Sequence, residues 1–260
     1  MRMIACVAAL GGVLMTGAPV TAQWLSYPTA GIPRLADGKP NLAAPAQRTA
    51  DGKPDLYGIW EPTPKYLRNI ASDLKPEDVP LQSWADAVYK ERLTGARARE
   101  EPDANCLPQG VPKIDAAPAP YKFINMPTGI AVLYEAFTQW RQIFTDGRPL
   151  PKDPNPTWFG YSIGRWEGDT LVVDTIGFNG KGWLDQVGHP TTDALHVTER
   201  FTRRNVGEMD LRITIDDPKA YTKPWDVTES LRLLVDSELL EFVCHENNRD
   251  LEHLPGQPLR

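Results

Sequence analysis

The stretch Trp158-Phe-Gly-Tyr-Ser-Ile-Gly-Arg-Trp-Glu-Gly-Asp-Thr-Leu-Val-Val-Asp-Thr-Ile-Gly-Phe178 predicts a β-hairpin. Its centre, Glu167-Gly168-Asp169, favours a turn, because glycine reaches positive φ and the flanking acids hydrogen-bond their own backbone. The residues on either side are β-branched or aromatic, which favours strands. A Gly- and Asp-rich link then leads to Ala194-Leu-His-Val-Thr-Glu-Arg-Phe201, which predicts a further strand.

Glu199 is the most informative residue of this further strand. Leu195, Val197 and Phe201 alternate onto one face at period two, and Glu199 falls on that same face. A carboxylate in the apolar register of a strand has a high desolvation cost unless it is paired, hydrogen-bonded or used in chemistry. We therefore expect these four side chains to point inward, with His196 pointing outward, and take Glu199 as a candidate catalytic residue.

The pattern of strands extends over most of the chain. About nine segments have strand character, from Leu56–Trp60 to a last hairpin formed by residues 227–235 and 239–246. Residues 101–128 are expected to be irregular. Only the segment at about 80–99 has apolar residues at the three- and four-residue spacing of a helix. So many sequential strands favour an antiparallel meander that closes into a β-barrel, because open sheet edges invite aggregation.

The N-terminal residues predict a secretory signal peptide over residues 1–22. Arg2 supplies the positive charge, a short apolar stretch follows, and Val20-Thr21-Ala22 forms a small-residue cleavage site before Gln23. The apolar stretch is too short to span a membrane. We therefore expect a periplasmic or secreted protein.

An extended arm is expected between the leader and the barrel. Residues 23–55 are rich in Pro, Ala and Gly, and the segment Ala-Asp-Gly-Lys-Pro occurs twice, at 36–40 and 50–54. Asp-Gly-Lys-Pro is a turn signal, and two copies are too few for a repeat architecture. Residues 56–260 are then expected to form a single barrel domain.

Charge and cysteine content narrow the partners and the compartment. The net charge of -6 argues against nucleic acid and against anionic membrane surfaces as partners. Cys106 and Cys244 remain after removal of the leader, and two cysteines in an oxidising compartment usually form a disulfide. Closing so long a loop stabilises by roughly 4 kcal/mol in the chain-entropy model. The alternative is a thiolate nucleophile at Cys244. The oligomeric state stays open.

The connection between the hairpin and the Glu199 strand is the candidate site. It runs from Trp183 to Asp193 and is longer than most connections, which is typical of functional loops. Asp185 and His189 lie on it, and with Glu199 they form a candidate acid–base set, because histidine titrates near neutral pH. The alternative is structural, with the histidine capping a turn and the aspartate in an Asx-turn.

Two arginines flank a predicted turn and are candidates for holding a substrate. Arg141 and Arg148 lie on either side of Gln-Ile-Phe-Thr-Asp-Gly, and either can bind a carboxylate or enolate bidentately. The alternative is a structural ion pair with Asp146 or Glu135. The candidate substrate-binding residues are Arg141, Arg148, Tyr161, Trp183 and His196. The sequence contains neither a zinc-ligand spacing nor a nucleotide motif, so we expect no metal and no other cofactor.

Five motifs, taken together, resemble a family of secreted bacterial proteins. They are Ala50-Asp-Gly-Lys-Pro-Asp-Leu56 with Gly58-Ile-Trp60, Cys106-Leu-Pro-Gln-Gly-Val-Pro112, Arg141-Gln-Ile-Phe-Thr-Asp-Gly-Arg-Pro149, Gly164-Arg-Trp-Glu-Gly-Asp-Thr-Leu-Val-Val173 and Leu195-His-Val-Thr-Glu-Arg-Phe201. The resemblance covers nearly the whole mature chain and implies a shared fold, but no particular activity. The Gly-x-Trp start before an antiparallel meander is also similar to lipocalin-like barrels. The predicted fold is therefore a mainly β, lipocalin-like barrel with an extended N-terminal arm and one helix.

These features predict an exported barrel that binds a small aromatic or sugar-derived molecule. We expect a cofactor-independent enzyme, a lyase, isomerase or hydrolase, with Glu199, Asp185 and His189 as its acid–base groups. The alternatives are a non-catalytic periplasmic carrier and a structural envelope protein that uses its Pro-rich arm for contacts. A carrier needs an apolar cavity with one or two orienting groups, whereas an enzyme gathers several titratable groups.

Overall fold

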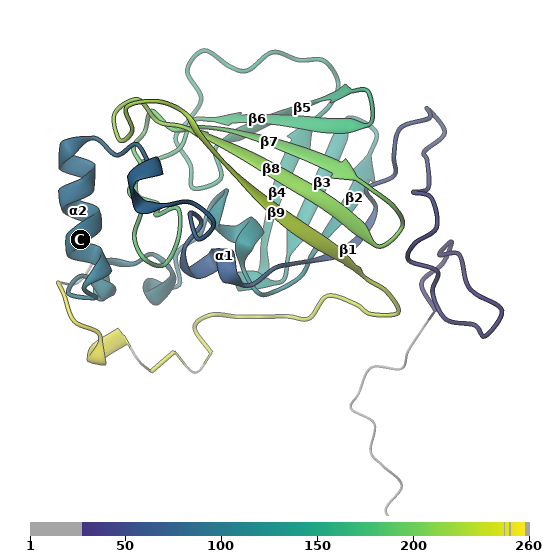
Figure 1. Cartoon of the computed structure of the whole chain (residues 1–260), viewed down its shortest axis with the longest axis horizontal. Coiled ribbons are helices and arrows are strands. Elements are labelled where there is room, and N and C mark those ends of the chain that lie inside the picture. The colour runs from purple at the N-terminus through teal and green to yellow at the C-terminus, as the bar shows by residue number, and fades with distance from the viewer. Residues whose placement is uncertain (1–27, 247, 250, 258–260) are drawn as a thin grey trace, which may run out of the picture.

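Nine strands close into a single barrel in the computed structural model, which describes residues 28–246, 248–249 and 251–257 (Figure 1). Each strand pairs with the next in sequence, and β9 pairs with β1. The strands are β1 (Gly58–Pro62), β2 (Tyr121–Met126), β3 (Gly129–Tyr134), β4 (Gln139–Phe144), β5 (Tyr161–Glu167), β6 (Thr170–Ile176), β7 (His196–Arg203), β8 (Glu208–Asp216) and β9 (Trp225–Leu234). The predicted closed, mainly β fold is confirmed. The predicted signal peptide lies outside the described residues.

The seam between β4 and β5 departs from the predicted antiparallel meander. These two strands run parallel, and only Ile143–Ser162 and Phe144–Ile163 pair across it. A parallel pair requires a long connection, and the proline-rich segment at 145–160 supplies it. The barrel is therefore mixed, with eight antiparallel pairings and one parallel pairing.

Two segments differ from the prediction: one expected strand is absent, and one segment expected to be irregular forms a strand. Residues 239–246 do not form a strand, because β1 already occupies the free edge of β9. Residues 121–126, expected to be irregular, instead form β2, with Tyr121 and Phe123 alternating into the interior. The number of strands agrees with the prediction, but one of them lies elsewhere in the chain.

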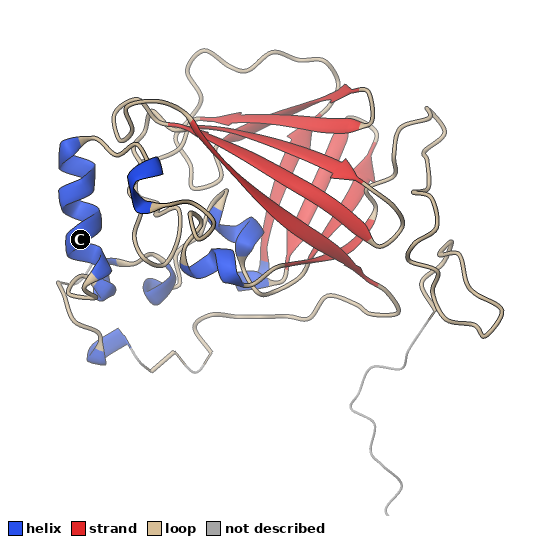
Figure 2. Cartoon of the chain, in the orientation of Figure 1, coloured by secondary structure: helices blue, strands red, loops and turns tan. Residues whose placement is uncertain are grey.

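Helices gather at one end of the barrel (Figure 2). The main helix, α2 (Ser83–Leu93), is shorter than the predicted 80–99, and the chain turns at Gly95, whose φ of 78° favours glycine. A second helix, α1 (Lys65–Arg68), has a single turn. The remaining helical segments are 3₁₀ turns at Pro76–Asp78, Ala98–Glu100, Asp103–Asn105, Lys113–Ala116, Ala136–Thr138 and Leu251–His253.

The two copies of the Asp-Gly-Lys-Pro segment in the arm adopt the same local structure. Isolated bridges join Arg34 to Pro40 and Arg48 to Pro54. In each copy the arginine at the start donates to the glycine carbonyl of the turn, four residues later. Arg48 also pairs with Asp169 in the β5–β6 turn, so the arm is anchored to the barrel. The arm lies at the end of the barrel opposite α2 (Figure 1).

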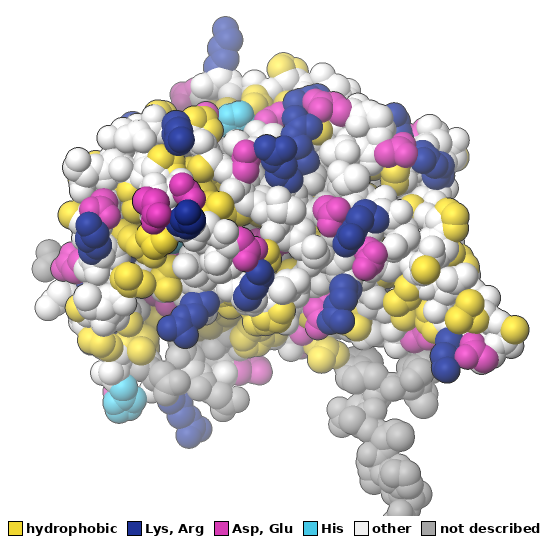
Figure 3. All heavy atoms as spheres, viewed as in Figure 1, with side chains coloured by type: hydrophobic (Ala, Val, Ile, Leu, Met, Phe, Trp, Pro, Cys, Tyr) yellow, Lys and Arg dark blue, Asp and Glu magenta, His cyan; other side chains and the backbone are white. Residues whose placement is uncertain are grey.

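Alternation along the strands separates a buried interior from a charged exterior. The predicted register of β7 is confirmed: Leu195, Val197, Glu199 and Phe201 are buried, whereas His196 is partly exposed. Ion pairs cover the outer faces of the strands, and Figure 3 shows basic and acidic side chains interspersed on one face of the molecule. In the described part of the chain, no helix combines the length and the apolar character needed to cross a membrane.

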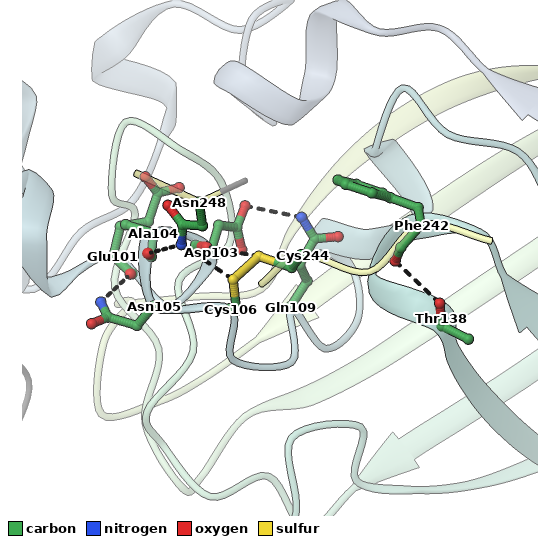
Figure 4. Close-up of a disulfide and its surroundings, with 10 residues drawn as sticks. All are labelled: Glu101, Asp103, Ala104, Asn105, Cys106, Gln109, Thr138, Phe242, Cys244 and Asn248. Carbon is green, nitrogen blue, oxygen red and sulfur yellow. Dashed lines mark hydrogen bonds between the residues drawn. A yellow bond between two sulfur atoms is a disulfide. The ribbon is translucent and has the colours of Figure 1, made fainter. Parts of the chain in front are cut away.

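A disulfide holds the C-terminal segment against the barrel end. Cys106 and Cys244 are bonded across 138 positions of sequence, as predicted (Figure 4). Nearby, Thr138 Oγ1 donates to the carbonyl of Phe242 at 3.1 Å. The disulfide also fixes the loop that starts at Cys106, which runs beside the opening between β4 and β5. The oxidised cysteines exclude Cys244 as a thiolate nucleophile in this state.

Candidate functional site

Arg141 on β4 and Glu199 on β7 form a buried ion pair inside the barrel. Nη1 of Arg141 donates to Oε1 of Glu199 at 2.9 Å, and Nη2 donates to Oε2. Arg141 also donates through Nε to Ser162 Oγ at 3.0 Å and through Nη2 to Thr175 Oγ1 at 2.8 Å. The guanidinium therefore lies along the inner faces of four neighbouring strands. The predicted alternatives for Arg141, pairing with Asp146 or Glu135, do not occur.

A second carboxyl group, Asp115, adjoins this ion pair. It comes from the 3₁₀ turn Lys113–Ala116 and accepts a hydrogen bond from the hydroxyl of Tyr134 at 2.9 Å. Burial, together with the charge of Glu199, raises the pKa of Asp115 well above its ordinary range. The raised pKa favours a neutral Asp115, and a neutral carboxyl group lies beside the Glu199 carboxylate at a lower cost than a second negative charge.

Glu229 on β9 is the third carboxyl group of the interior. It is fully buried, and neither of its oxygens has a hydrogen-bond partner among the described residues. Burial, reinforced by the charge of Glu199, raises the pKa of Glu229 to about 8. The hydroxyl of Tyr121 is also buried and unpartnered within the described chain. Buried polar groups without partners are rare in folded proteins and mark sites that need a functional or solvent explanation.

The parallel seam between β4 and β5 opens a groove in the barrel wall. Because β5 pairs only with the last residues of β4, the edge at 139–142 is left free, and a groove of about 520 Å³ occupies the gap. Its aromatic lining residues are Trp140, Phe144, Trp158, Phe159 and Tyr161. The buried Arg141 and Ser162 also line it, so polar groups lie at its depth. This volume lies within the range of roughly 300–1,000 Å³ that is typical of small-molecule sites.

Glycine is required at one edge of this groove. Gly160 has a φ of 63°, and a Cβ at this position would lie 2.6 Å from the carbonyl oxygen of Ile176. The chain can therefore leave the β4 edge and follow the end of β6 only with glycine at this position. Residues at this edge instead follow the end of β6, where Thr157 bridges Phe178.

Arg148 and Tyr161, two predicted substrate-binding residues, meet at the rim of the groove. The guanidinium of Arg148 lies 3.9 Å from the ring centroid of Phe144, and its Nη1 donates to the Tyr161 hydroxyl at 3.2 Å. Arg148 also pairs with Asp146, which was the predicted structural alternative for this arginine. The stacked rings of Phe144 and Tyr161 thus carry a cation at the surface of the groove.

Asp185 and His189 form a separate buried pair at the end of the barrel. His189 Nδ1 lies 2.5 Å from Asp185 Oδ2, and the imidazole stacks on Tyr89 of α2 with ring centroids 4.2 Å apart. Asp185 also accepts hydrogen bonds from the backbone N–H groups of Ile70, Gly188 and His189 at 2.9–3.1 Å. The carboxylate therefore orients the imidazole and fixes the loop at the same time.

The remaining predicted site residues lie apart from the interior carboxyl groups. No hydrogen bond joins Glu199 to Asp185 or His189 in the described part of the chain. Trp183 lies beside Arg92 and lines a second pocket. His196 is on the outer face of β7, with Nε2 3.1 Å from Asp174 Oδ1. Within the described residues, no group of three or more His, Cys, Asp or Glu side chains is arranged to hold a metal ion.

Asp115, Glu229 and the groove were not predicted from the sequence. Glu229 follows the same alternation rule as Glu199, since Trp225, Val227 and Leu231 share its face of β9, so the rule itself was sufficient to find it. Asp115 has no such signal, because it lies in a 3₁₀ turn without strand periodicity. The groove depends on the parallel seam, which hydrophobic alternation does not reveal.

Comparison with known proteins does not assign a family or a function to this chain. No family model, no curated protein and no solved structure matches the chain, and its resemblance to a family of secreted bacterial proteins stays a prediction.

Proposed function

We propose that this protein is an exported enzyme that binds a small aromatic or sugar-derived molecule in the groove between β4 and β5 and transforms it by cofactor-independent acid–base chemistry. In this proposal the interior carboxyl groups exchange protons with the bound molecule. The reaction class is that of a lyase, isomerase or hydrolase, each of which needs a proton donor and a proton acceptor at one site.

The observation that carries the proposal is that the interior buries three carboxyl groups, Asp115, Glu199 and Glu229, of which only Glu199 is hydrogen-bonded to the guanidinium of Arg141 among the described residues. The one cation compensates one carboxylate, and burial raises the pKa of both other groups, which favours their protonated forms. A site that holds both carboxylic acids and a carboxylate supplies a proton donor and a proton acceptor together. A carrier has no use for three such groups, whose burial lowers stability.

The groove gives this cluster its route to a ligand. Arg141 and Ser162 line the groove and also touch the cluster through their hydrogen bonds. A planar ring between the aromatic walls would thus lie next to a polar floor. Because hydrogen bonds at the floor already hold the guanidinium in place, its orientation is set before a ligand arrives.

Asp185 and His189 enter the proposal as a second proton-transfer pair at the barrel end. His189 Nε2 has no hydrogen-bond partner among the described residues, while Nδ1 is held by Asp185. This arrangement suits an imidazole that takes up and releases a proton at one nitrogen. The same bonds also stabilise the loop, so a substitution must separate the two roles.

Export is part of the proposal and is supported by the Cys106–Cys244 disulfide. Disulfides persist in oxidising compartments such as the periplasm and are rare in reducing ones. The test is an N-terminal sequence of protein isolated from the periplasm, which should begin at or near Gln23. Recovery of full-length protein from the cytoplasm alone would refute export without affecting the site.

Proton exchange on a bound ligand tests the enzymatic function even while the natural substrate is unidentified. A panel of aromatic and sugar-derived molecules is incubated with the protein in D₂O, and loss of carbon-bound proton signals and new products are followed by NMR. We expect exchange or turnover that falls about 100-fold or more in Glu199→Gln. The exposed Glu238→Gln is the matched control and should behave like the wild type. Binding without exchange or turnover would identify a carrier instead.

A further inference from the structure

A second pocket adjoins the groove on the other side of Trp158. It has a volume of about 490 Å³ and is lined by Arg92, Trp183 and Lys181 among others. Trp158 lines both this pocket and the groove, and the neighbouring residues Leu107 and Pro108 each line one of them. The two spaces therefore lie next to each other and share Trp158 as a lining residue.

The side chain of Arg92 dominates the chemistry of the second pocket. Its guanidinium stacks on Trp183 at 4.1 Å from the ring centroid, and Nη1 donates to the carbonyl of Gly188 at 3.1 Å. No carboxylate pairs with Arg92 among the described residues, and its Nε is buried without a partner. Burial and the charge of Arg97 lower the pKa of Arg92 to about 10, so the guanidinium remains charged at neutral pH.

An uncompensated, partly buried cation has a high desolvation cost, which an anion would offset. Glu100 lines the pocket as well, but its carboxylate already pairs with Arg97 through Nε and Nη2. Lys181 adds a second positive charge to the lining. Guanidinium groups are preferred partners of carboxylates, because their N–H donors match the two carboxylate oxygens.

We infer that the second pocket binds a carboxylate, and that the ligand is an elongated aromatic acid whose ring lies in the groove while its carboxylate reaches Arg92 past Trp158. This inference rests on the proposed function, because it assigns the groove to the ring of the same ligand. It deepens that function by defining the substrate class as an acid with at least two linked units.

A purely structural role for Arg92 makes a different prediction. The arginine lies in the last turn of α2, where a cation favours the helix dipole, and its bond to Gly188 connects α2 to the Asp185–His189 loop. In that case its removal lowers stability without changing the preference between charged and neutral ligands. Ligand preference, rather than activity or stability, is therefore the measurement that separates the two roles.

Two ligands of matched shape test the inference. Biphenyl-4-carboxylate and biphenyl-4-methanol differ mainly in charge, and their binding to the oxidised protein is measured by isothermal titration calorimetry. We expect the wild type to prefer the carboxylate by about 10-fold or more, the scale of one charged hydrogen bond. Arg92→Gln should reduce this preference to within about twofold and leave the affinity for the alcohol unchanged, which also shows that the variant is folded.

Two further variants complete the test. Lys90→Gln removes a charge from the same helix at an exposed position and should keep the carboxylate preference. Trp140→Ala, in the groove, should weaken binding of both probes equally. An unchanged preference in Arg92→Gln, or no binding of either probe to the wild type, overturns the inference. If Arg92→Gln loses the preference but Trp140→Ala has no effect on binding, the ligand does not span both pockets. The groove is then not the site of its ring.

Discussion

Arg141 donates two parallel hydrogen bonds to Glu199, which lies 58 residues later and three strands away in the barrel wall. Both side chains are almost completely shielded from solvent. This one ion pair therefore combines a structural role with the proposed catalytic role, because Arg141 both stabilises the Glu199 carboxylate and lines the groove. The effect of substituting Glu199 alone must therefore be compared with the effect of substituting Arg141 and Glu199 together.

Breaking this pair on one side should lower stability sharply. Glu199→Gln leaves the buried guanidinium of Arg141 uncompensated, and we expect a loss of about 3 kcal/mol in the free energy of unfolding. The double variant Arg141→Met/Glu199→Leu removes both charges and should recover most of this loss while abolishing proton exchange. Urea unfolding of the single and double variants provides the measurement. A fully stable Glu199→Gln would show that the ion pair contributes little.

Glu229 should make the protein less stable as the pH rises. Its pKa in the folded protein is raised to about 8 by burial and by Glu199, above the ordinary value of about 4.3 in the unfolded chain. Between these values the folded state binds the extra proton, so the free energy of unfolding falls with increasing pH. We expect Glu229→Gln to match the wild type near pH 4 and to exceed it by several kcal/mol above pH 8.

Unfolding midpoints in urea, measured from pH 4 to pH 9, isolate this contribution as the difference between wild type and Glu229→Gln. Glu238→Gln again serves as the control, since its side chain is exposed and should leave the pH dependence unchanged. Parallel curves for the wild type and Glu229→Gln would mean that Glu229 ionises at its ordinary pKa, and the interior would then have to contain a compensating partner.

Asp185 should prove indispensable to the loop that carries Trp183. It accepts three backbone hydrogen bonds and one from His189, and asparagine offers only one oxygen for these donors. We expect Asp185→Asn to cost about 2–3 kcal/mol, because buried donors lose their acceptor. Thermal unfolding measures the cost, with the exposed Asp193→Asn as the control. A stable Asp185→Asn that has lost turnover would support a catalytic role over a structural one.

Removal of the disulfide should affect both stability and the groove. The loop between Cys106 and Cys244 is long, and its closure contributes roughly 4–5 kcal/mol in the chain-entropy model. In Cys106→Ser/Cys244→Ser we expect rapid proteolysis after Val235, where the chain leaves the barrel, and weaker ligand binding because Pro108 is no longer held. Limited proteolysis with mass spectrometry locates the cleavage. Protection equal to that of the wild type would show that noncovalent contacts suffice.

Strand alternation predicted much of this fold, and particular residues show where it stops. It placed Glu199 inside the barrel, because the side-chain period of a strand is independent of tertiary contacts. It did not identify Arg141 as the partner, since that pairing depends on which strands become neighbours. Alternation is equally compatible with parallel and antiparallel neighbours, so it could not predict the parallel pairing of β4 and β5. The only sign of this pairing in the sequence is the long connection between the two strands. The segment at 239–246 has strand character, yet β1 had already paired with β9.

The seam between β4 and β5 has fewer paired residues than any other junction of the barrel. The strands from β5 to β9 pair in sequence through six to eight residues at each junction, whereas the seam contributes only two. Local hairpins form before distant strands meet, because their loop-closure entropy is smaller. The β5–β9 meander should therefore assemble first and keep the slowest amide exchange, while the edge of β4 joins last and opens first. The wall of the groove is thus also the part of the barrel that we expect to form last during folding and to open first.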